Sequence, residues 1–170
     1  MLSNILIAIS ITLMYSTPLA LAAMGGVISE RSGVVNIGIE GMMSIGALAG
    51  AAVGYFSGNP WLGLLFAGIA GGLMSLFHAV ASITFRADQT VSGIALNLIG
   101  PGLALYLSRH FFGGATLTLP VPKKLPKIFD SQHLQGTAFS NFNLDVTVIL
   151  AAIVVTLTWF LLYKTKWGLR

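Results

Sequence analysis

The sequence contains no cysteine and few charged residues. Without cysteine it can form no disulfide bridge, thiolate metal site or cysteine nucleophile. Nine Lys and Arg and five Asp and Glu make up 8% of the 170 residues, whereas soluble globular domains are about one quarter charged. Because so little charge cannot cover a solvated surface, the composition excludes soluble enzymes, disordered tails and nucleic-acid-binding modules.

Apolar residues dominate what is present. Hydrophobic residues make up 55% of the chain, 20 residues are glycine, and the mean hydropathy is +0.86. This composition indicates a protein dissolved in membrane lipid. The formal net charge is +4, but the basic residues are scattered between apolar runs. That scatter is typical of loops that anchor helices at the headgroups and not of a surface that binds nucleic acid.

Charge-free runs predict the architecture. A bilayer core about 30 Å thick is crossed by about 20 helical residues. The sequence therefore predicts an all-α, polytopic integral membrane protein, with about five transmembrane helices in a single domain over residues 1–170. The predicted spans are residues 5–24, 41–57, 61–85, 90–112 and 144–163. Pro18 and Pro101 predict kinks in the first and fourth spans.

The first span has a second interpretation. A small-residue pattern at residues 20–22 is also typical of a signal-peptide cleavage site, although no basic residue precedes Arg31. The basic residues decide the orientation only narrowly. Three of them lie in the last seven residues, which favours a cytoplasmic C-terminus and an external N-terminus.

Residues 113–143 are predicted to form an external loop. The loop contains Pro120, Pro122 and Pro126, and residues 116–119 alternate between threonine and leucine. We expect a short extended piece or a surface helix here. The loop is either a plain structured connection or a docking surface for an extracytoplasmic partner.

Residues 25–40 form the most informative segment. They are too apolar for a solvated loop and too polar to face lipid, which predicts a broken or re-entrant segment beside an aqueous path. On a helical turn Asn36 and Glu40 would share one face and offer an amide and a carboxylate to a solute. The alternative is an interfacial loop in which Glu30, Arg31 and Glu40 are hydrated at the headgroups.

Further polar residues lie in the third and fourth spans and in the link between them. Gln89, Ser92 and Asn97 are candidate residues of a substrate pathway, although bonding to another helix is the usual role of a lone membrane Asn. His78 has no second histidine or carboxylate at helical metal-site spacing, so it is interpreted as a hydrogen-bonded interior residue. Asp145 would complement the N-terminus of the last helix.

Glycines recur every four residues in the second span. Gly46, Gly50, Gly54 and Gly58 predict a ridge for close helix packing, and Gly68 and Gly72 extend the pattern into the third span. No catalytic pair, metal site, cofactor site or phosphate-binding loop is predicted. If nucleotide energy is used, another subunit must therefore bind the nucleotide.

Residues 26–43 (GVISERSGVVNIGIEGMM) closely resemble the signature of the permease subunits of bacterial ABC importers for nucleosides and simple sugars. Residues 89–98 (QTVSGIALNL) resemble the family's opening of a later helix, and residues 165–170 (TKWGLR) resemble the start of its cytoplasmic coupling region. Asp88 stands where the family is expected to have Asn. Permeases for ribose-type sugars and branched-chain amino acids share looser versions of the first motif.

The resemblance implies partners and a location. It implies a second permease subunit, separate ATP-binding subunits and an extracytoplasmic solute-binding protein, in the inner or plasma membrane of a bacterium. It also implies that residues 164–170 begin the ATPase-coupling region, through Lys164, Lys166, Trp167, Gly168 and Arg170. Family members have roughly twice as many helices, so we expect an N-terminal fragment, a frame-shifted product or one piece of a split gene.

Two other functions compete with an ABC permease. An ion-coupled secondary carrier also uses broken helices, but it normally needs carboxylates inside the membrane, and here the candidate carboxylates lie at span boundaries. A non-transporting membrane scaffold would account for the glycine ridge but not for residues 36–40.

Overall fold

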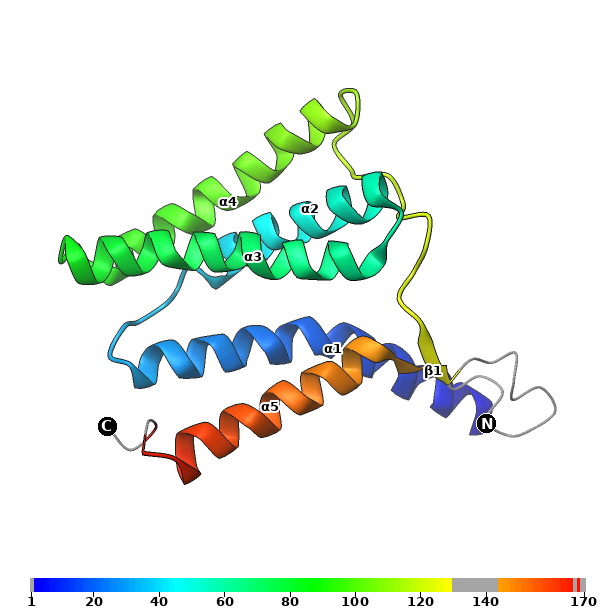
Figure 1. Cartoon of the computed structure of the whole chain (residues 1–170), viewed down its shortest axis with the longest axis horizontal. Helices are drawn as coiled ribbons and strands as arrows, with labels where there is room; N and C mark the ends of the chain where they lie inside the picture. Colours follow the sequence, from blue (N-terminus) through cyan, green and yellow to red (C-terminus); the bar gives the residue numbers. More distant parts are fainter. Residues whose placement is uncertain (1, 130–143, 167, 169–170) are drawn as a thin grey trace. The chain divides into compact units, whose positions relative to one another are not determined.

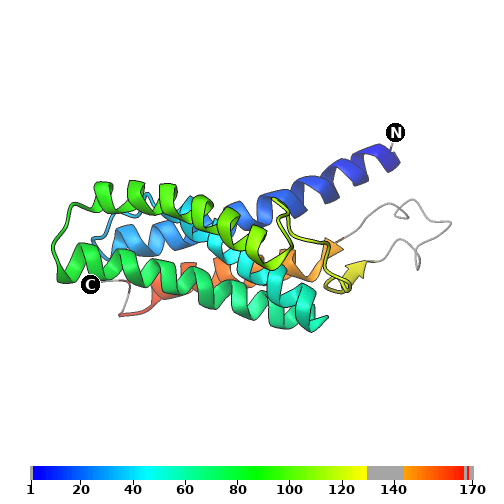
Figure 2. The same cartoon turned by 90° about the horizontal axis from the view of Figure 1, so that it is seen from above.

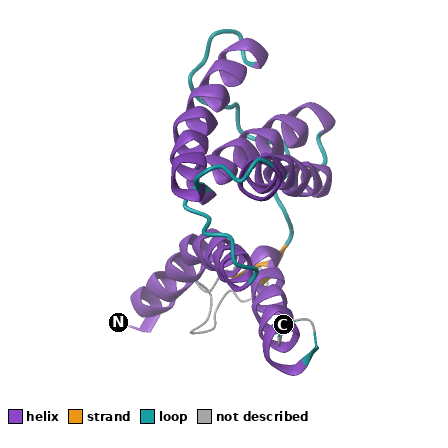
Figure 3. Ribbon diagram, turned by 90° about the vertical axis from the view of Figure 1, so that its left-hand side faces the viewer, coloured by secondary structure: helices purple, strands orange, loops and turns teal. Residues whose placement is uncertain are grey.

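The computed structural model describes residues 2–129, 144–166 and 168. The described part is mostly helical, with one short pair of strands (Figures 1 and 3). The elements are α1 (Leu2–Arg31), α2 (Ile39–Ser57), α3 (Pro60–Ala79), the π-helix η1 (Val80–Thr84), α4 (Gln89–Phe111), β1 (Lys127–Phe129), β2 (Leu144–Asp145) and α5 (Val146–Lys164).

The predicted five-span, all-α membrane architecture is confirmed. Five helices are long and apolar enough to cross a membrane: the third combines α3 with η1, and the others are α1, α2, α4 and α5. Large apolar side chains are exposed along all five, among them Ile11, Phe56, Phe77, Leu98 and Phe160. Such surfaces suit lipid or other membrane helices and not water.

The first helix is longer than predicted. α1 continues through residues 25–31, and the irregular backbone is confined to residues 32–38, which we call the connecting segment. The predicted span ended at residue 24, but Gly25 and Gly26 only lower helix propensity and do not end the helix. α1 and α4 also continue through Pro18 and Pro101.

The chain divides into two compact units. One comprises residues 1–25 and 125–170, and it contains most of α1, the strand pair and α5. β1 and β2 are antiparallel, with Lys127 opposite Asp145. A short extended piece, one of the two forms predicted within residues 113–143, is therefore present at residues 127–129, and residues 130–143 lie outside the described residues.

The other unit, residues 26–124, contains α2, α3, η1 and α4. α2 packs against both α3 and α4 (Figure 2), and the buried core of these helices is formed by Met42, Met74 and Leu96. An added Cβ on Gly50 would lie 3.2 Å from the Gly63 carbonyl oxygen, and one on Gly46 would lie 3.1 Å from the Ala67 carbonyl oxygen. The α2 glycines thus let α3 approach to backbone contact.

Gly58 has a different role from the one predicted. It is the left-handed C-cap of α2, with φ 64°, and nothing lies within 4 Å of its Cβ position. Gly68 and Gly72 likewise have open space at the Cβ position. The contacting glycines of α2 therefore end at Gly54, because a C-cap glycine is selected for its backbone conformation and not for packing.

Candidate functional site: the clamped connecting segment

The connecting segment begins where α1 ends in a glycine cap. Gly33 has φ +86°; its N–H donates to the Glu30 carbonyl at 3.0 Å, and the Val34 N–H donates to the Ser29 carbonyl at 3.1 Å. These two bonds form a Schellman motif, with Gly33 in the left-handed position. The Ser29 hydroxyl closes the turn by donating to the Val34 carbonyl at 2.7 Å. The Ser-Gly-Val sequence of residues 32–34 is the signal that would have located this helix end.

The start of α2 is fixed by two asparagine side chains. Asn36 Oδ1 accepts from the Gly38 N–H at 3.0 Å, and Asn36 Nδ2 lies 3.6 Å from Met42 Sδ. Asn97 of α4 accepts from the Gly41 N–H at 2.8 Å and donates to the Ile37 carbonyl at 2.8 Å. Since the first N–H groups of a helix have no partner within it, Asn97 caps α2 from a neighbouring helix.

Two further side chains of the α3–α4 hairpin hold the other end of the segment. Gln89 Oε1 accepts from the Val35 N–H at 2.7 Å, and Gln89 Nε2 lies 3.5 Å from the Gly33 carbonyl oxygen. His78 Nε2 lies 3.2 Å from the Val35 carbonyl oxygen, and His78 Nδ1 lies 3.0 Å from Ser92 Oγ. His78 is only 3% exposed, so the interior, hydrogen-bonded role predicted for it is confirmed.

Of the five residues predicted to form a substrate pathway, four meet at the connecting segment. Gln89 and Asn97 bind its backbone directly, Ser92 binds it through His78, and Asn36 belongs to it. We call His78, Gln89, Ser92 and Asn97 the polar clamp. Glu40 stands apart, because its side chain is exposed in the first turn of α2.

The helical face predicted to join Asn36 and Glu40 does not form. Asn36 lies outside the helix, because α2 begins only at Ile39. Its amide oxygen bonds the backbone two residues on, which is the local competition with helix that asparagine commonly provides.

Glycine contacts that the sequence analysis missed bring α4 close enough for the clamp. An added Cβ on Gly100 would lie 2.5 Å from Gly41 Cα, and one on Gly93 would lie 3.0 Å from the Gly38 nitrogen. A Cβ on Gly41 would collide with the Leu96 carbonyl. Only hydrogen-sized side chains allow this spacing. Gly38 and Gly41 are three residues apart, whereas Gly93 and Gly100 are seven apart. Because the two spacings differ, no repeat in the sequence indicated this close approach.

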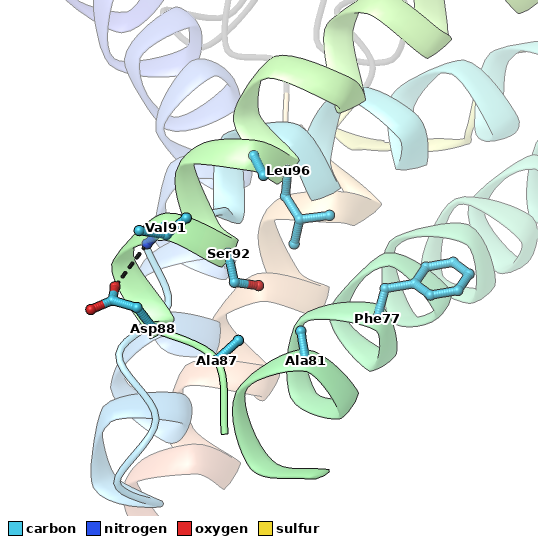
Figure 4. Close-up of a pocket in the computed structure, with 8 residues that line it drawn as sticks. Phe77, Ala81, Ala87, Asp88, Val91, Ser92 and Leu96 are labelled. Atoms are coloured by element: carbon cyan, nitrogen blue, oxygen red, sulfur yellow. Dashed lines mark hydrogen bonds between the residues drawn. The ribbon is translucent and has the colours of Figure 1, made fainter. Parts of the chain in front are cut away.

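A pocket of about 430 Å³ lies beside the clamp, between the end of α3 and the start of α4 (Figure 4). Apart from Asp88 and Ser92 it is lined by apolar side chains, of which Phe77 is the largest. Ser92 points from α4 towards Phe77 and Ala81 (Figure 4). The Ser92 hydroxyl is bonded to His78, and an Asp88 carboxylate oxygen accepts from the Val91 N–H at 2.9 Å. These walls suit an apolar group better than a sugar, whose hydroxyls need several free polar partners.

An unusual turn shapes this pocket. α3 continues into η1, and the chain reverses through Arg86, which has φ 53°. Within η1 the Ser82 hydroxyl is buried without a hydrogen-bond partner. Single-turn π-helices are rare and concentrate at functional sites. The sequence pattern gave no indication of this π-helix.

Comparison with known proteins identifies the family. Residues 8–170 match the family described as the branched-chain amino acid transport system / permease component. The chain belongs to this permease family. The resemblance seen in residues 26–43 is therefore confirmed, and the chain is a multi-pass membrane component of a transport system. Members of this family are permease components and not enzymes.

Individual relatives are similar over nearly all of this permease chain. It is 46% identical to the guanosine ABC transporter permease protein of Bacillus subtilis, with 96% of this chain and 54% of that protein covered. It is 39% identical to the nucleoside ABC transporter permease protein of Lactococcus lactis, with 93% and 52% covered. It is 37% identical to the putative glucose ABC transporter permease protein of Haloferax volcanii, with 94% and 48% covered. The permease chain spans about half the length of these curated relatives. No solved structure matches it significantly.

The remaining predicted residues lie near the end of α5. Lys164 Nζ lies 5.7 Å from the centroid of the Trp159 ring, and the Gly168 N–H donates to the Thr165 carbonyl at 3.3 Å. Lys166 is exposed, and Trp167 and Arg170 lie outside the described residues. At the other end of α5, Asp145 is the N-cap residue but makes no side-chain capping bond. Among the residues the structure describes, no three His, Asp or Glu side chains gather as a metal site would require.

Proposed function

We propose that the permease chain forms part of the translocation path of a bacterial ABC importer for a nucleoside or a related small polar solute such as a simple sugar. The observation that carries the proposal is the 46% identity, over 96% of the chain, to the guanosine permease protein of Bacillus subtilis. The 39% identity to a nucleoside permease protein points to the same solute class. The putative glucose permease, at 37% identity, makes a simple sugar the second candidate.

The proposed transporter lies in the bacterial plasma membrane. It contains a second permease subunit, separate ATP-binding subunits that hydrolyse ATP, and an extracytoplasmic solute-binding protein. The basic stretch at the end of α5 and just after it, which includes Lys164, Lys166 and Gly168, faces the cytoplasm and begins the region that meets an ATP-binding subunit. The loop at residues 113–143 faces the opposite side of the membrane.

Within this chain we propose that the connecting segment lines the solute path. Backbone without helical bonding is tolerated at membrane depth where it is buried in protein or borders a water-filled cavity. Because Gln89, Ser92 and Asn97 are bonded within the protein, they act by holding the segment in place instead of binding the solute. Glu40, which is exposed beside the segment, is the member of the predicted set that is free to meet solute or a partner subunit.

The positions of the carboxylates favour an ATP-driven importer over an ion-coupled carrier. Each of the four described acidic residues stands at a helix end: Glu30 in the last turn of α1, Glu40 in the first turn of α2, Asp88 at the N-cap of α4 and Asp145 at the N-cap of α5. Ion-coupled carriers normally place carboxylates between transmembrane helices, where they bind the coupling ion. None of the described acidic residues occupies such a place.

Uptake into right-side-out membrane vesicles tests the proposal. The complete transporter, with its binding protein and ATP-binding subunits, is assayed with radiolabelled guanosine after the vesicles are loaded with ATP or with a non-hydrolysable analogue. We expect uptake only with internal ATP, and competition by unlabelled nucleosides in preference to glucose. Uptake driven by a sodium or proton gradient without ATP would indicate a secondary carrier. Preferential competition by glucose would show that the solute is a sugar and not a nucleoside.

A further inference from the structure

The His78 side chain links three separate parts of the permease chain, namely α3, α4 and the connecting segment. It lies in the last turn of α3, immediately before η1. One ring nitrogen contacts Ser92 of α4, and the other contacts the Val35 carbonyl of the connecting segment. With 3% of its surface exposed, the ring has little access to water, so its hydrogen bonds must be made within the protein.

The Val35 carbonyl fixes which nitrogen carries the proton. A carbonyl oxygen can only accept a hydrogen bond, so His78 Nε2, 3.2 Å from the Val35 oxygen, must be the N–H nitrogen. In the neutral ring Nδ1 then has a lone pair and accepts from the Ser92 hydroxyl, 3.0 Å away. The Val35 carbonyl therefore selects the tautomer, and the Ser92 hydroxyl, which can donate or accept, is compatible with it by donating to Nδ1.

Val35 is held from both sides of its peptide backbone. Its N–H donates to Gln89 Oε1 at 2.7 Å, and its carbonyl accepts from His78. The Gln89 contact comes from the first residue of α4, whereas the His78 contact comes from the end of α3. The backbone at Val35 is therefore positioned by both arms of the α3–α4 hairpin.

We propose that His78 is a positioning residue: in the Nε2–H tautomer that the Val35 carbonyl requires, it fixes that carbonyl and so holds the connecting segment in the shape that the solute meets. This inference rests on the proposed function for the solute path, but the hydrogen bond and its effect on the segment can be measured without transport. The competing explanation is that the imidazole only fills space between α3 and α4.

Three substitutions separate these explanations. Glutamine places an amide N–H near the position of Nε2, so H78Q retains a donor for the Val35 carbonyl. Asparagine is one carbon shorter than glutamine, so H78N places its amide near the position of Nδ1. There it reaches Ser92 but not the Val35 carbonyl. Phenylalanine keeps the ring volume and loses both bonds. If His78 positions the segment, glutamine rescues and phenylalanine does not; if it fills space, phenylalanine is the better replacement.

The first readout is thiol labelling at the segment. The sequence contains no cysteine, so Val34→Cys, at a half-buried position next to Val35, reports how often the segment opens. The complete transporter is used, with any cysteine outside this sequence replaced beforehand. We expect the maleimide labelling rate to rise about two- to tenfold in H78F and H78N, the range set by the loss of one hydrogen bond, and to stay within twofold of the parent in H78Q. H110F is the matched control, because His110 is an exposed histidine near the end of α4, and its rate should not change.

The second readout is the tautomer itself. In ¹⁵N-histidine-labelled transporter the His78 signals, assigned by their loss in H78Q, should show a protonated Nε2 and an unprotonated Nδ1. In ATP-driven guanosine uptake, H78F should raise KM more than it lowers the maximal rate, with H78Q restoring KM. Equal labelling of H78F and the parent, labelling of H78Q as fast as H78F, or a protonated Nδ1 would each overturn the proposal. If the parent does not import nucleosides, the proposed function fails, while labelling and tautomer still decide the role of His78.

Discussion

The side-chain amide of Asn97 joins α4 to both ends of one backbone turn, accepting from the Gly41 N–H at 2.8 Å and donating to the Ile37 carbonyl at 2.8 Å. One residue thereby supplies the N-terminal cap that α2 lacks, since Gly38 at the N-cap position has no side chain with which to provide it. The connecting segment is therefore shaped by residues more than fifty positions away along the chain.

Asn97→Ala should destabilise the protein more than an ordinary surface change. It leaves the Gly41 N–H and the Ile37 carbonyl without their partner, at about 1–3 kcal/mol. Asn97→Asp keeps an acceptor for Gly41 but loses the donor to Ile37, so it should fall between Ala and the parent. Thermal unfolding of the purified complete protein in detergent measures the order of stability of the three proteins. Equal stability of Asn97→Ala and the parent would show that water replaces the amide and that the cap is not needed.

Gly100→Ala should push α4 away from α2. The new methyl group would meet Gly41 Cα at 2.5 Å, and overpacking of this kind typically costs about 1–3 kcal/mol. Gly102→Ala is the matched control, since nothing lies within 4 Å of its Cβ position in the same helix, and it should be neutral or slightly stabilising. Membrane abundance and thermal unfolding of the two variants provide the comparison. Similar behaviour of both would contradict the close approach of α4 and α2.

Gly50→Leu tests the contact between α2 and α3. An added Cβ already lies 3.0 Å from Ala67 Cβ and 3.2 Å from the Gly63 oxygen, so leucine should cost about 1–3 kcal/mol, at the upper end of that range. Gly72→Leu, at an open position in α3, should be tolerated. The two proteins are compared by extraction in detergent and by heating. If Gly50→Leu withstands both as well as Gly72→Leu does, the α2 glycines are not needed for the packing of α2 against α3.

Gly33→Ala should weaken the end of α1. The left-handed conformation at φ +86° costs an L-residue about 1 kcal/mol. Gly25→Ala, within α1 and with open space around it, should stabilise slightly through helix propensity. Thermal unfolding decides between them. A stabilising Gly33→Ala would mean that the helix continues past residue 33 and that the connecting segment begins later.

The sequence predicted the five spans well because hydropathy sums about 20 residues, so a single glycine or proline changes the average little. Helix ends depend on single hydrogen bonds, and the end of α1 was missed although Ser32-Gly33-Val34 carried the Schellman signal. Asn36, Gln89, Ser92 and Asn97 were singled out from the sequence as unusual polar residues, and their place in a substrate pathway stays a prediction. The partners of Gln89 and Asn97 could not be predicted, because backbone groups 54 to 60 residues away carry no side-chain signature. The residues were therefore assigned to a solute before their bonds within the protein were known.

Hydrogen exchange at the connecting segment tests most directly whether side chains of α3 and α4 hold it. In the complete transporter the Val35 and Gly41 amides should be protected, because they donate to Gln89 and Asn97 at 2.7 and 2.8 Å. Gln89→Ala should accelerate exchange at Val35 and leave Gly41 protected, whereas Asn97→Ala should do the reverse. Exchange of both amides in the parent at the rate of an unstructured peptide would contradict the account.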